Sequence, residues 1–170
     1  MASAAQGDLN AFEQIVLRHQ ALVWRIAYRF VGNSADAQDI TQIVFLKLFE
    51  AAPHYRPTAQ LKTYLFRIVT TTCIDHVRKN RPSTLGEPTD VSDHSPSTID
   101  AMIKQEKEKN VKQSIEMLPL RQRSVVALRY EAELSVREIA DILKVTEKAV
   151  ERLLAHARDT LFTVLKNKWT

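Results

Sequence analysis

Residues 135–154 restrict the possible folds more than any other part of the chain, because they predict two short helices joined by a tight turn. Ser135 and Glu138 form an S-x-x-E pattern, a capping box that pairs two amide donors at a helix start. Thr146 can cap the second helix in the same way. Small and branched apolar residues at helical spacing supply the contact between the two helices: Ile139, Ala140, Leu143, Val145, Val150 and Leu154. This is the pattern of a helix-turn-helix, whose second helix enters the DNA major groove.

The turn of this motif holds Lys144, at a place where a helix-turn-helix usually has glycine. The backbone there needs a positive φ, which costs a non-glycine residue about 1 kcal/mol. Capped helix pairs also occur in many all-helical proteins that do not bind DNA. The rest of the chain must therefore decide between these two interpretations.

Glycine is scarce, and this favours helices over a turn-rich β fold, since only three of the 170 residues are glycine. No run is long enough to span a membrane and residues 1–5 show no signal peptide, so we expect a cytoplasmic protein. The single cysteine, Cys73, excludes an internal disulfide and lies in a helical pattern that predicts a small buried residue. No metal-ligand cluster, catalytic triad or phosphate-binding glycine loop is present, so we expect no metal, no cofactor and no enzyme.

A segment rich in proline and acidic residues divides the chain. Residues 82–98 hold three of the six prolines and few large apolar residues, which predicts a flexible linker. Residues 82–100 contain four carboxylates and no lysine or arginine. The rest of the chain therefore has 24 basic and 16 acidic residues. Such an excess of positive charge favours nucleic acid as a partner. We expect an all-α fold with small helical domains at 1–81 and 104–170, joined by a flexible acidic linker at 82–103.

The N-terminal domain is predicted to be a three-helix bundle. Apolar residues recur at helical spacing from Phe12 to Phe30, Gly32 and Asn33 end this helix, and Ser34 can cap the next. The second helix stops before Pro53. The third is expected over residues 59–79, with an inward face of Leu61, Leu65, Ile68, Val69 and Thr72 and a polar face of Lys62, Arg67, Thr70, Thr71, Asp75 and Arg78.

The C-terminal domain is predicted to begin with a charged helix that Pro119 interrupts. A helix over residues 120–130 follows it. The helix-turn-helix comes next, and its last helix extends towards Leu165.

Four ordered blocks resemble the extracytoplasmic-function (ECF) sigma factors of bacterial RNA polymerase. Residues 7–13 resemble the family's opening, and residues 36–47 resemble its D-A-x-D-x-T-Q-x-V-F-x-K signature. Residues 61–79 resemble the helix that reads the −10 promoter element, and residues 118–130 the lead-in to a −35-binding helix-turn-helix. The resemblance implies a sigma-2-like and a sigma-4-like domain that direct promoter-specific transcription initiation.

The resemblance also implies the partners. These are the clamp coiled coil of the largest subunit and the flap of the second-largest subunit of RNA polymerase core, promoter DNA, and an anti-sigma factor. Such an anti-sigma factor can hold a cytoplasmic chain at the inner membrane without direct membrane insertion.

The core-binding residues implied by the resemblance are Asp36, Asp39, Gln42 and Lys47. The first three are spaced three apart, so they form one polar strip on a helix that suits the rim of an interface. An ordinary solvated face is the alternative. Gln38 and Ile43 stand where the family is often acidic, and Ile43 can extend an apolar part of this surface.

The −10 DNA-binding residues implied by the resemblance are Tyr55, Arg56, Lys62, Tyr64, Arg67, Thr71, Asp75, Arg78 and Lys79. The first two lie in a loop that corresponds to the family's flipped-base pocket. Basic side chains can hold phosphates while Tyr64 stacks on a base, although Tyr64 can equally pack in the core. Tyr64 and Thr71 replace the tryptophan and asparagine that are common in the family.

The −35 DNA-binding residues implied by the resemblance are Arg137, Thr146, Glu147, Lys148, Glu151, Arg152, Ala155, His156 and Arg158. Arg152 can pair with guanine and Glu151 can accept from cytosine N4. Residues 151–153 differ from the family's K/R-S-R, so the −35 sequence cannot be transferred. We expect Arg121, Arg123, Arg137 and Arg158 to touch phosphates or solvent, which contributes affinity without sequence information.

Two other functions stay open at this point. A stand-alone helix-turn-helix repressor or activator would use the N-terminal helices as a sensor or dimerisation domain. A sigma mimic would titrate an anti-sigma factor without reaching DNA. The D-A-x-D-x-T-Q block argues against the first, and promoter binding by a holoenzyme would exclude the second.

Overall fold

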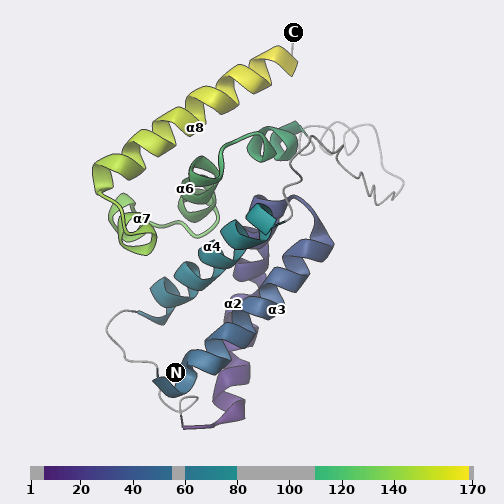
Figure 1. Ribbon diagram of the computed structural model, residues 1–170, viewed down its shortest axis with the longest axis vertical. Coiled ribbons are helices and arrows are strands. Elements are labelled where there is room, and N and C mark those ends of the chain that lie inside the picture. Colours follow the sequence, from purple (N-terminus) through teal and green to yellow (C-terminus); the bar gives the residue numbers. More distant parts are fainter. Residues whose placement is uncertain (1–5, 55–59, 80–109, 169–170) are drawn as a thin grey trace.

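The computed structural model describes residues 6–54, 60–79 and 110–168, and these residues contain helices and no strand (Figure 1). The elements are α2 (Leu9–Val31), α3 (Ser34–Ala51), a short 3-10 helix η1 (Ala52–His54), α4 (Leu61–Lys79), α6 (Leu120–Tyr130), α7 (Val136–Leu143) and α8 (Glu147–Lys168). Residues 110–116 are also helical. The expected all-α fold is confirmed, and none of the described helices is both long and apolar enough to cross a membrane.

Helices α2, α3 and α4 form the predicted three-helix bundle, with caps that the local sequence explains. Asp8 caps α2 by accepting a hydrogen bond from the amide of Ala11 at 3.0 Å. Gly32 ends it with φ 75°, and its amide donates to the carbonyl of Tyr28 at 2.8 Å. The expectation that Ser34 caps α3 is wrong, because extended Asn33 accepts from the amide of Asp36 at 2.8 Å and Ser34 is already helical.

The interior of the bundle agrees with most of the predicted apolar spacing. On α4, however, Leu61 and Ile68 are only half-buried, and Phe66, which was not predicted to face inward, is fully buried. Val23, Ile26 and Phe30 of α2 are fully buried with Leu65 and Val69 of α4. The sole thiol, Cys73, is also buried, and this burial raises its pKa.

Thr70 differs as well, because we expected it on the polar face but it is only 2% exposed. Thr70 lies one turn from both Phe66 and Cys73, on the buried side of the helix. Helix α4 also begins at Leu61, with Gln60 outside the helix, whereas residue 59 lies outside the described residues.

Helices α7 and α8 form the predicted helix-turn-helix. The capping box of Ser135 and Glu138 is present, and Thr146 accepts from the amide of Ala149 at 3.2 Å. Lys144 adopts the left-handed conformation at φ 55° and ψ 49°. Hydrogen bonds from the Ser135 side chain and amide lower the pKa of Glu138. The charged Glu138 carboxylate therefore stabilises the cap fully at pH values above the ordinary pKa of a glutamate. This stabilisation is lost as the pH falls through the lowered pKa.

The apolar contact between these two helices is close to the prediction. Ile139 and Val150 are fully buried, Ala140 and Leu154 nearly so, and Leu143 is half-buried. Val145 differs, since it is 39% exposed in the turn. Its amide bonds to the carbonyl of Ala140, so Val145 closes the turn with its backbone rather than packing between the helices.

The two domains lie directly against each other and share one apolar cluster. This cluster runs from Phe30 and Leu65 of the bundle to Val125, Leu128 and Ile139 of the second domain. Figure 1 shows α6 and α7 along the same side of the bundle, next to α4 and the end of α2. The predicted linker at 82–103 lies outside the described residues.

Candidate functional site

The outer face of α8 carries the −35 candidates. Glu147, Lys148, Glu151, Arg152, Ala155, His156 and Arg158 are all exposed over the first turns of this helix. The opposite face holds Val150, Leu154 and Ala157, which are buried. Thr146, directly before α8, and Arg137 on α7 are also exposed. The structure therefore brings the predicted −35 residues of α8 together on one open surface.

Both charge signs occur on this surface, so it differs from a simple phosphate-binding patch. Glu147 and Glu151 alternate with Lys148 and Arg152 on the exposed side. An arginine can donate two hydrogen bonds to guanine, whereas a carboxylate can accept from cytosine. Such an arrangement is suited to reading base edges.

The −10 candidates on α4 divide into two groups. Arg67, Thr71, Asp75 and Arg78 follow one another at spacings of three or four, so they share one side of the helix. Lys62 lies elsewhere, with its Nζ 5.5 Å from the centre of the Phe66 ring. Lys79 is exposed at the end of the helix. Tyr55 and Arg56 lie outside the residues that the structure describes.

Two side chains of this −10 face are only partly exposed and contact other parts of the protein. Tyr64 is half-buried and packs against the apolar cluster, which favours the packing alternative. Arg67 is also half-buried, and its Nη2 donates to the carbonyl of Asp141 on α7 at 3.1 Å. Thr71 is exposed, but its hydroxyl donates to the carbonyls of its own helix at Arg67 and Ile68. The second domain therefore covers part of the predicted −10 face.

The core-binding candidates on α3 also separate. Asp39 and Gln42 are exposed. Asp36 faces α4, where Nε2 of His76 lies 3.4 Å from its carboxylate. Lys47 donates from Nζ to the hydroxyl of Thr72 at 3.1 Å. Two of the four predicted residues therefore join α3 to α4.

Three apolar side chains complete the open face of α3. Ile43, Leu46 and Phe49 are 40%, 57% and 42% exposed and share a side with Asp39 and Gln42. Of these three, sequence reasoning identified Ile43 alone. The apolar residues of α3 spread around most of the helix, so periodicity could not show which would stay exposed.

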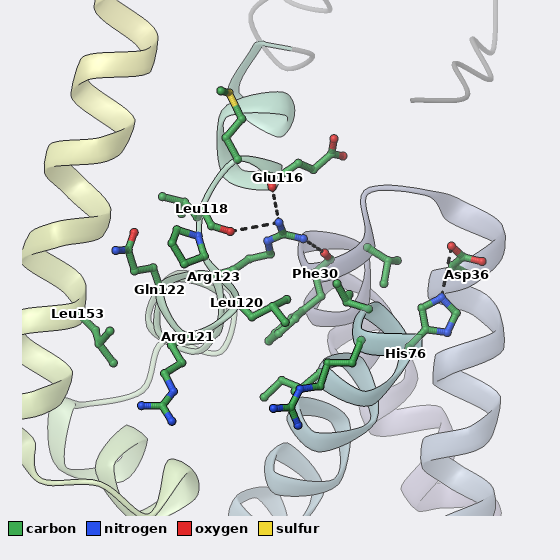
Figure 2. Close-up of a pocket in the computed structure, with 16 residues that line it drawn as sticks. Phe30, Asp36, His76, Glu116, Leu118, Leu120, Arg121, Gln122, Arg123 and Leu153 are labelled. Carbon is green, nitrogen blue, oxygen red and sulfur yellow. Dashed lines mark hydrogen bonds and ion pairs between the residues drawn. The ribbon is translucent and has the colours of Figure 1, made fainter. Parts of the chain in front are cut away.

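A cavity of about 1230 Å³ lies between the two domains. Its lining includes Phe30, Arg78, Leu118, Arg121 and Leu153. Figure 2 shows Phe30, Leu118, Arg121 and Leu153 around this space. Arg121 is exposed, as expected for a surface arginine.

Arg123 corrects the expectation that it would touch phosphate or solvent. It is 9% exposed, and Figure 2 shows its guanidinium turned towards the end of α2. It donates to the backbone carbonyls of Phe30, Glu116 and Leu118. The partial negative charge of the carbonyls at the end of α2 stabilises the cation. Because its acceptors lie on both domains, Arg123 joins them.

Family models match both halves of the chain. The sigma-70 region 2 model matches residues 15–82, and the sigma-70 region 4 model matches residues 108–161. The ECF RNA polymerase sigma factor SigW of Bacillus subtilis is 28% identical over 95% of this chain and 92% of its own length. The RNA polymerase sigma-H factor of Pseudomonas aeruginosa is 30% identical over 95% of this chain and 89% of its own.

Solved structures share the fold. CnrH in complex with the cytosolic domain of CnrY has a TM-score of 0.75 at 26% identity, covering 98% of this chain and 94% of CnrH. The sigma factor RpoE of Bartonella quintana, in complex with the anti-sigma factor NepR, has a TM-score of 0.72 at 19% identity, covering 92% of this chain and 97% of its own. With both region models matched and relatives aligned along most of their length, the chain belongs to the extracytoplasmic-function group of RNA polymerase sigma factors, which direct transcription initiation.

Proposed function

We propose that this chain binds RNA polymerase core through the open face of α3, reads −35 duplex DNA with α8 and captures the melted −10 strand with α4. One observation supports this most strongly. The face of α3 and the face of α8 are both exposed, lie on different domains and carry side chains suited to different partners. Sigma factors are initiation factors rather than enzymes, and a stand-alone repressor or a sigma mimic is not favoured.

The face of α3 has the composition of a protein interface. Exposed Ile43, Leu46 and Phe49 form an apolar centre, and Asp39 and Gln42 lie beside it as polar groups. Interfaces commonly combine an apolar core with a polar rim. The clamp coiled coil of the polymerase, itself a pair of helices, is the partner we assign to this face. The flap of the second-largest subunit is assigned to the second domain.

Co-elution of the purified chain with RNA polymerase core on size exclusion tests the proposal. A stable complex near one-to-one is expected. Failure with active core, together with DNA binding by the chain alone, would instead indicate a stand-alone regulator.

Replacing Asp39 and Gln42 together by alanine should weaken core binding about tenfold, because both groups lie on the open face of α3. Leu46→Asp should weaken it further, since it places a charge in the apolar centre of that face. Affinity can be measured by fluorescence anisotropy of labelled chain titrated with core. Leu17→Asp is the matched control, because Leu17 is a leucine on α2 that is 55% exposed, close to the 57% of Leu46, and lies on neither proposed core-binding surface. Equal affinity of all four proteins would place the interface elsewhere.

Arg152→Ala should reduce −35-dependent initiation by about 1–3 kcal/mol, because it removes the side chain best placed to pair with guanine. The measurement compares transcripts from a promoter selected with the wild-type holoenzyme and from the same promoter with its −35 element scrambled. Arg18→Ala, an exposed arginine on α2, serves as control. If the wild-type chain itself transcribes both templates equally, the assignment of α8 to the −35 element fails.

An anti-sigma partner is part of the proposal. The structural relatives CnrH and RpoE are each recorded in a complex, RpoE with the anti-sigma factor NepR. We propose that a comparable protein binds this chain in the cytoplasm and can hold it at the inner membrane. Recovery of the chain in the membrane fraction, lost after deletion of that partner, would test the localisation.

A further inference from the structure

We propose that Lys47 and Asp36 of α3 are positioning residues for −10 DNA and do not bind RNA polymerase core. They fix the rotation of α4 about its axis, and with it the direction in which the −10 side chains of α4 point. The structure joins each of them to α4, Lys47 to Thr72 and Asp36 to His76. The inference rests on the proposed −10 role of α4, whereas the two contacts belong to the fold of the bundle.

The contact of Lys47 reaches a buried hydroxyl. Nζ of Lys47 donates to the hydroxyl oxygen of Thr72 at 3.1 Å, and the two residues are 25 positions apart in the chain. Thr72 is only 5% exposed, and a buried hydroxyl is destabilising when it loses a partner. The donor carries a charge, which makes such a bond stronger than one between neutral groups. Lys47 is therefore an exposed residue whose ammonium group is held by α4.

The contact of Asp36 lies at the start of α3. One carboxylate oxygen of Asp36 is 3.4 Å from Nε2 of His76, and Figure 2 shows the two side chains facing each other. The same oxygen accepts a hydrogen bond from Nδ2 of Asn33 at 2.6 Å. Asn33 also caps α3 by accepting from the amide of Asp36. The cap residue therefore helps to hold the carboxylate in the orientation that meets α4.

The two contacts use one side of each helix. Asp36 and Lys47 are about three turns apart, so they lie on the same side of α3. Their partners Thr72 and His76 are one turn apart and share a side of α4. The polar residues of α3 therefore divide into two pairs. Asp36 and Lys47 meet α4, whereas Asp39 and Gln42 lie on the open face.

Each held residue of α4 directly follows a −10 candidate. Thr71 precedes Thr72, and Asp75 precedes His76. Neighbouring residues of a helix point about 100° apart, so holding Thr72 and His76 against α3 leaves Thr71 and Asp75 turned outward. Both of these candidates are exposed. Apolar packing has little directional preference, whereas a hydrogen bond weakens steeply when it bends, so the polar contacts define the rotation of α4 more sharply than its apolar neighbours do.

Helix α3 thus contacts a different partner on each of two sides. Its open face is the proposed core-binding surface, and its other side holds α4 through Lys47 and Asp36. Because both sides belong to one helix, docking of α3 on core also sets the direction of the −10 face relative to the polymerase. The two sides should therefore have separable effects, one on core binding and the other on promoter melting.

Two single variants test the contact of Lys47. Lys47→Met keeps a long side chain and removes the charge and the donors, and Thr72→Val keeps the shape of the side chain and removes the acceptor. Both should leave the affinity for core, measured by fluorescence anisotropy, within about twofold of the wild type. Both should slow open-complex formation about fivefold, because the −10 side chains are no longer held in one direction. Permanganate reactivity of thymines in the melted region measures this rate on a promoter selected with the wild-type holoenzyme.

The double variant and the conservative variants separate positioning from a general loss of stability. K47M/T72V should melt the promoter no more slowly than either single variant, because all three lack the same bond. Lys47→Arg and Thr72→Ser keep the donor and the acceptor, and each should restore most of the rate. Thr163→Val is the control for the loss of a threonine hydroxyl, since this exposed hydroxyl bonds within α8 to the carbonyl of Asp159. Circular dichroism verifies that each variant is folded.

Asp36→Ala tests the second contact by the same two measurements. It should also leave core affinity unchanged and slow open-complex formation. The variant that replaces Asp39 and Gln42 by alanine should behave in the opposite way. Its core affinity falls, and its melting rate should return to that of the wild type once core is saturating.

Three results would overturn the inference. Weaker core binding by Lys47→Met or Asp36→Ala would return that residue to the core-binding surface. Additive losses in K47M/T72V would show that Lys47 and Thr72 act separately. Unchanged melting by Lys47→Met and Thr72→Val would show that the bond does not position α4.

Arg78→Ala distinguishes this last result from a failure of the proposed function. Arg78 is an exposed −10 candidate on α4, so its loss should slow melting whatever positions the helix. If Arg78→Ala slows melting and Lys47→Met does not, the positioning role alone is wrong. If Arg78→Ala also leaves melting unchanged, the proposed −10 role of α4 is wrong.

Discussion

Arg123→Ala is expected to lower the free energy of unfolding by about 3–5 kcal/mol, the largest loss that a single side chain of the interface should produce. The variant removes a buried cation and leaves the carbonyls of Phe30, Glu116 and Leu118 without this donor. Urea denaturation followed by circular dichroism measures the loss. Because the domains share one apolar cluster, weakening their contact should also turn one transition into two, with a smaller m value for each.

Arg121→Ala is the matched control, since Arg121 is an exposed arginine two residues away on the same helix. It should change the stability by less than about 0.5 kcal/mol. Arg123→Lys should fall between the two, because an ammonium group cannot span acceptors on both domains as a guanidinium does. Similar losses for Arg121→Ala and Arg123→Ala would show that Arg123 does not join the domains.

Ile139→Ala should destabilise the chain by about 2–5 kcal/mol and weaken −35 binding with it. Ile139 is fully buried in the cluster between α7 and the rest of the fold. Shortening this side chain leaves a cavity under α7. Because α8 packs on α7, the cavity should also disturb the position of α8. Thermal unfolding and gel-shift titration of the holoenzyme on a −35 duplex measure the two effects on one preparation.

Val145→Ala provides the comparison for Ile139→Ala. The sequence alone places both residues in the contact between the helices, but Val145 is 39% exposed. Its truncation should cost less than about 1 kcal/mol and leave DNA binding intact. A loss as large as that of Ile139→Ala would mean that Val145 packs inside the motif after all.

The features that the sequence predicted best depend on residues close together in the chain. The capping box of Ser135 and Glu138 spans three residues, and Lys144 supplies the left-handed turn that any residue at that place must adopt. Gly32 ends α2 for the same local reason. Such patterns carry their own partners, so the helix-turn-helix and the ends of most helices could be derived before any packing was known.

The features that were missed depend on partners far away in the chain. Arg123 and its acceptor at Phe30 are 93 residues apart, and Arg29 and Glu131 are 102 apart. A lone arginine in a basic domain looks the same in sequence whether it meets phosphate or a buried carbonyl. Arg67 and Lys47 show the same ambiguity, because each can bind a ligand or another helix, and only the arrangement of the elements decides.

The acceptors of Arg123 have a consequence for how this joint can change during evolution. The groups that it binds at Phe30, Glu116 and Leu118 are main-chain oxygens, which every amino acid supplies. Substitutions at those three positions can accumulate without removing the acceptors, so no compensating change in α6 is required. The pair of Glu131 and Arg29 is different, because a change in one side chain favours a change in the other. Correlated substitutions among relatives would therefore reveal the edge of this interface and leave its most buried contact unseen.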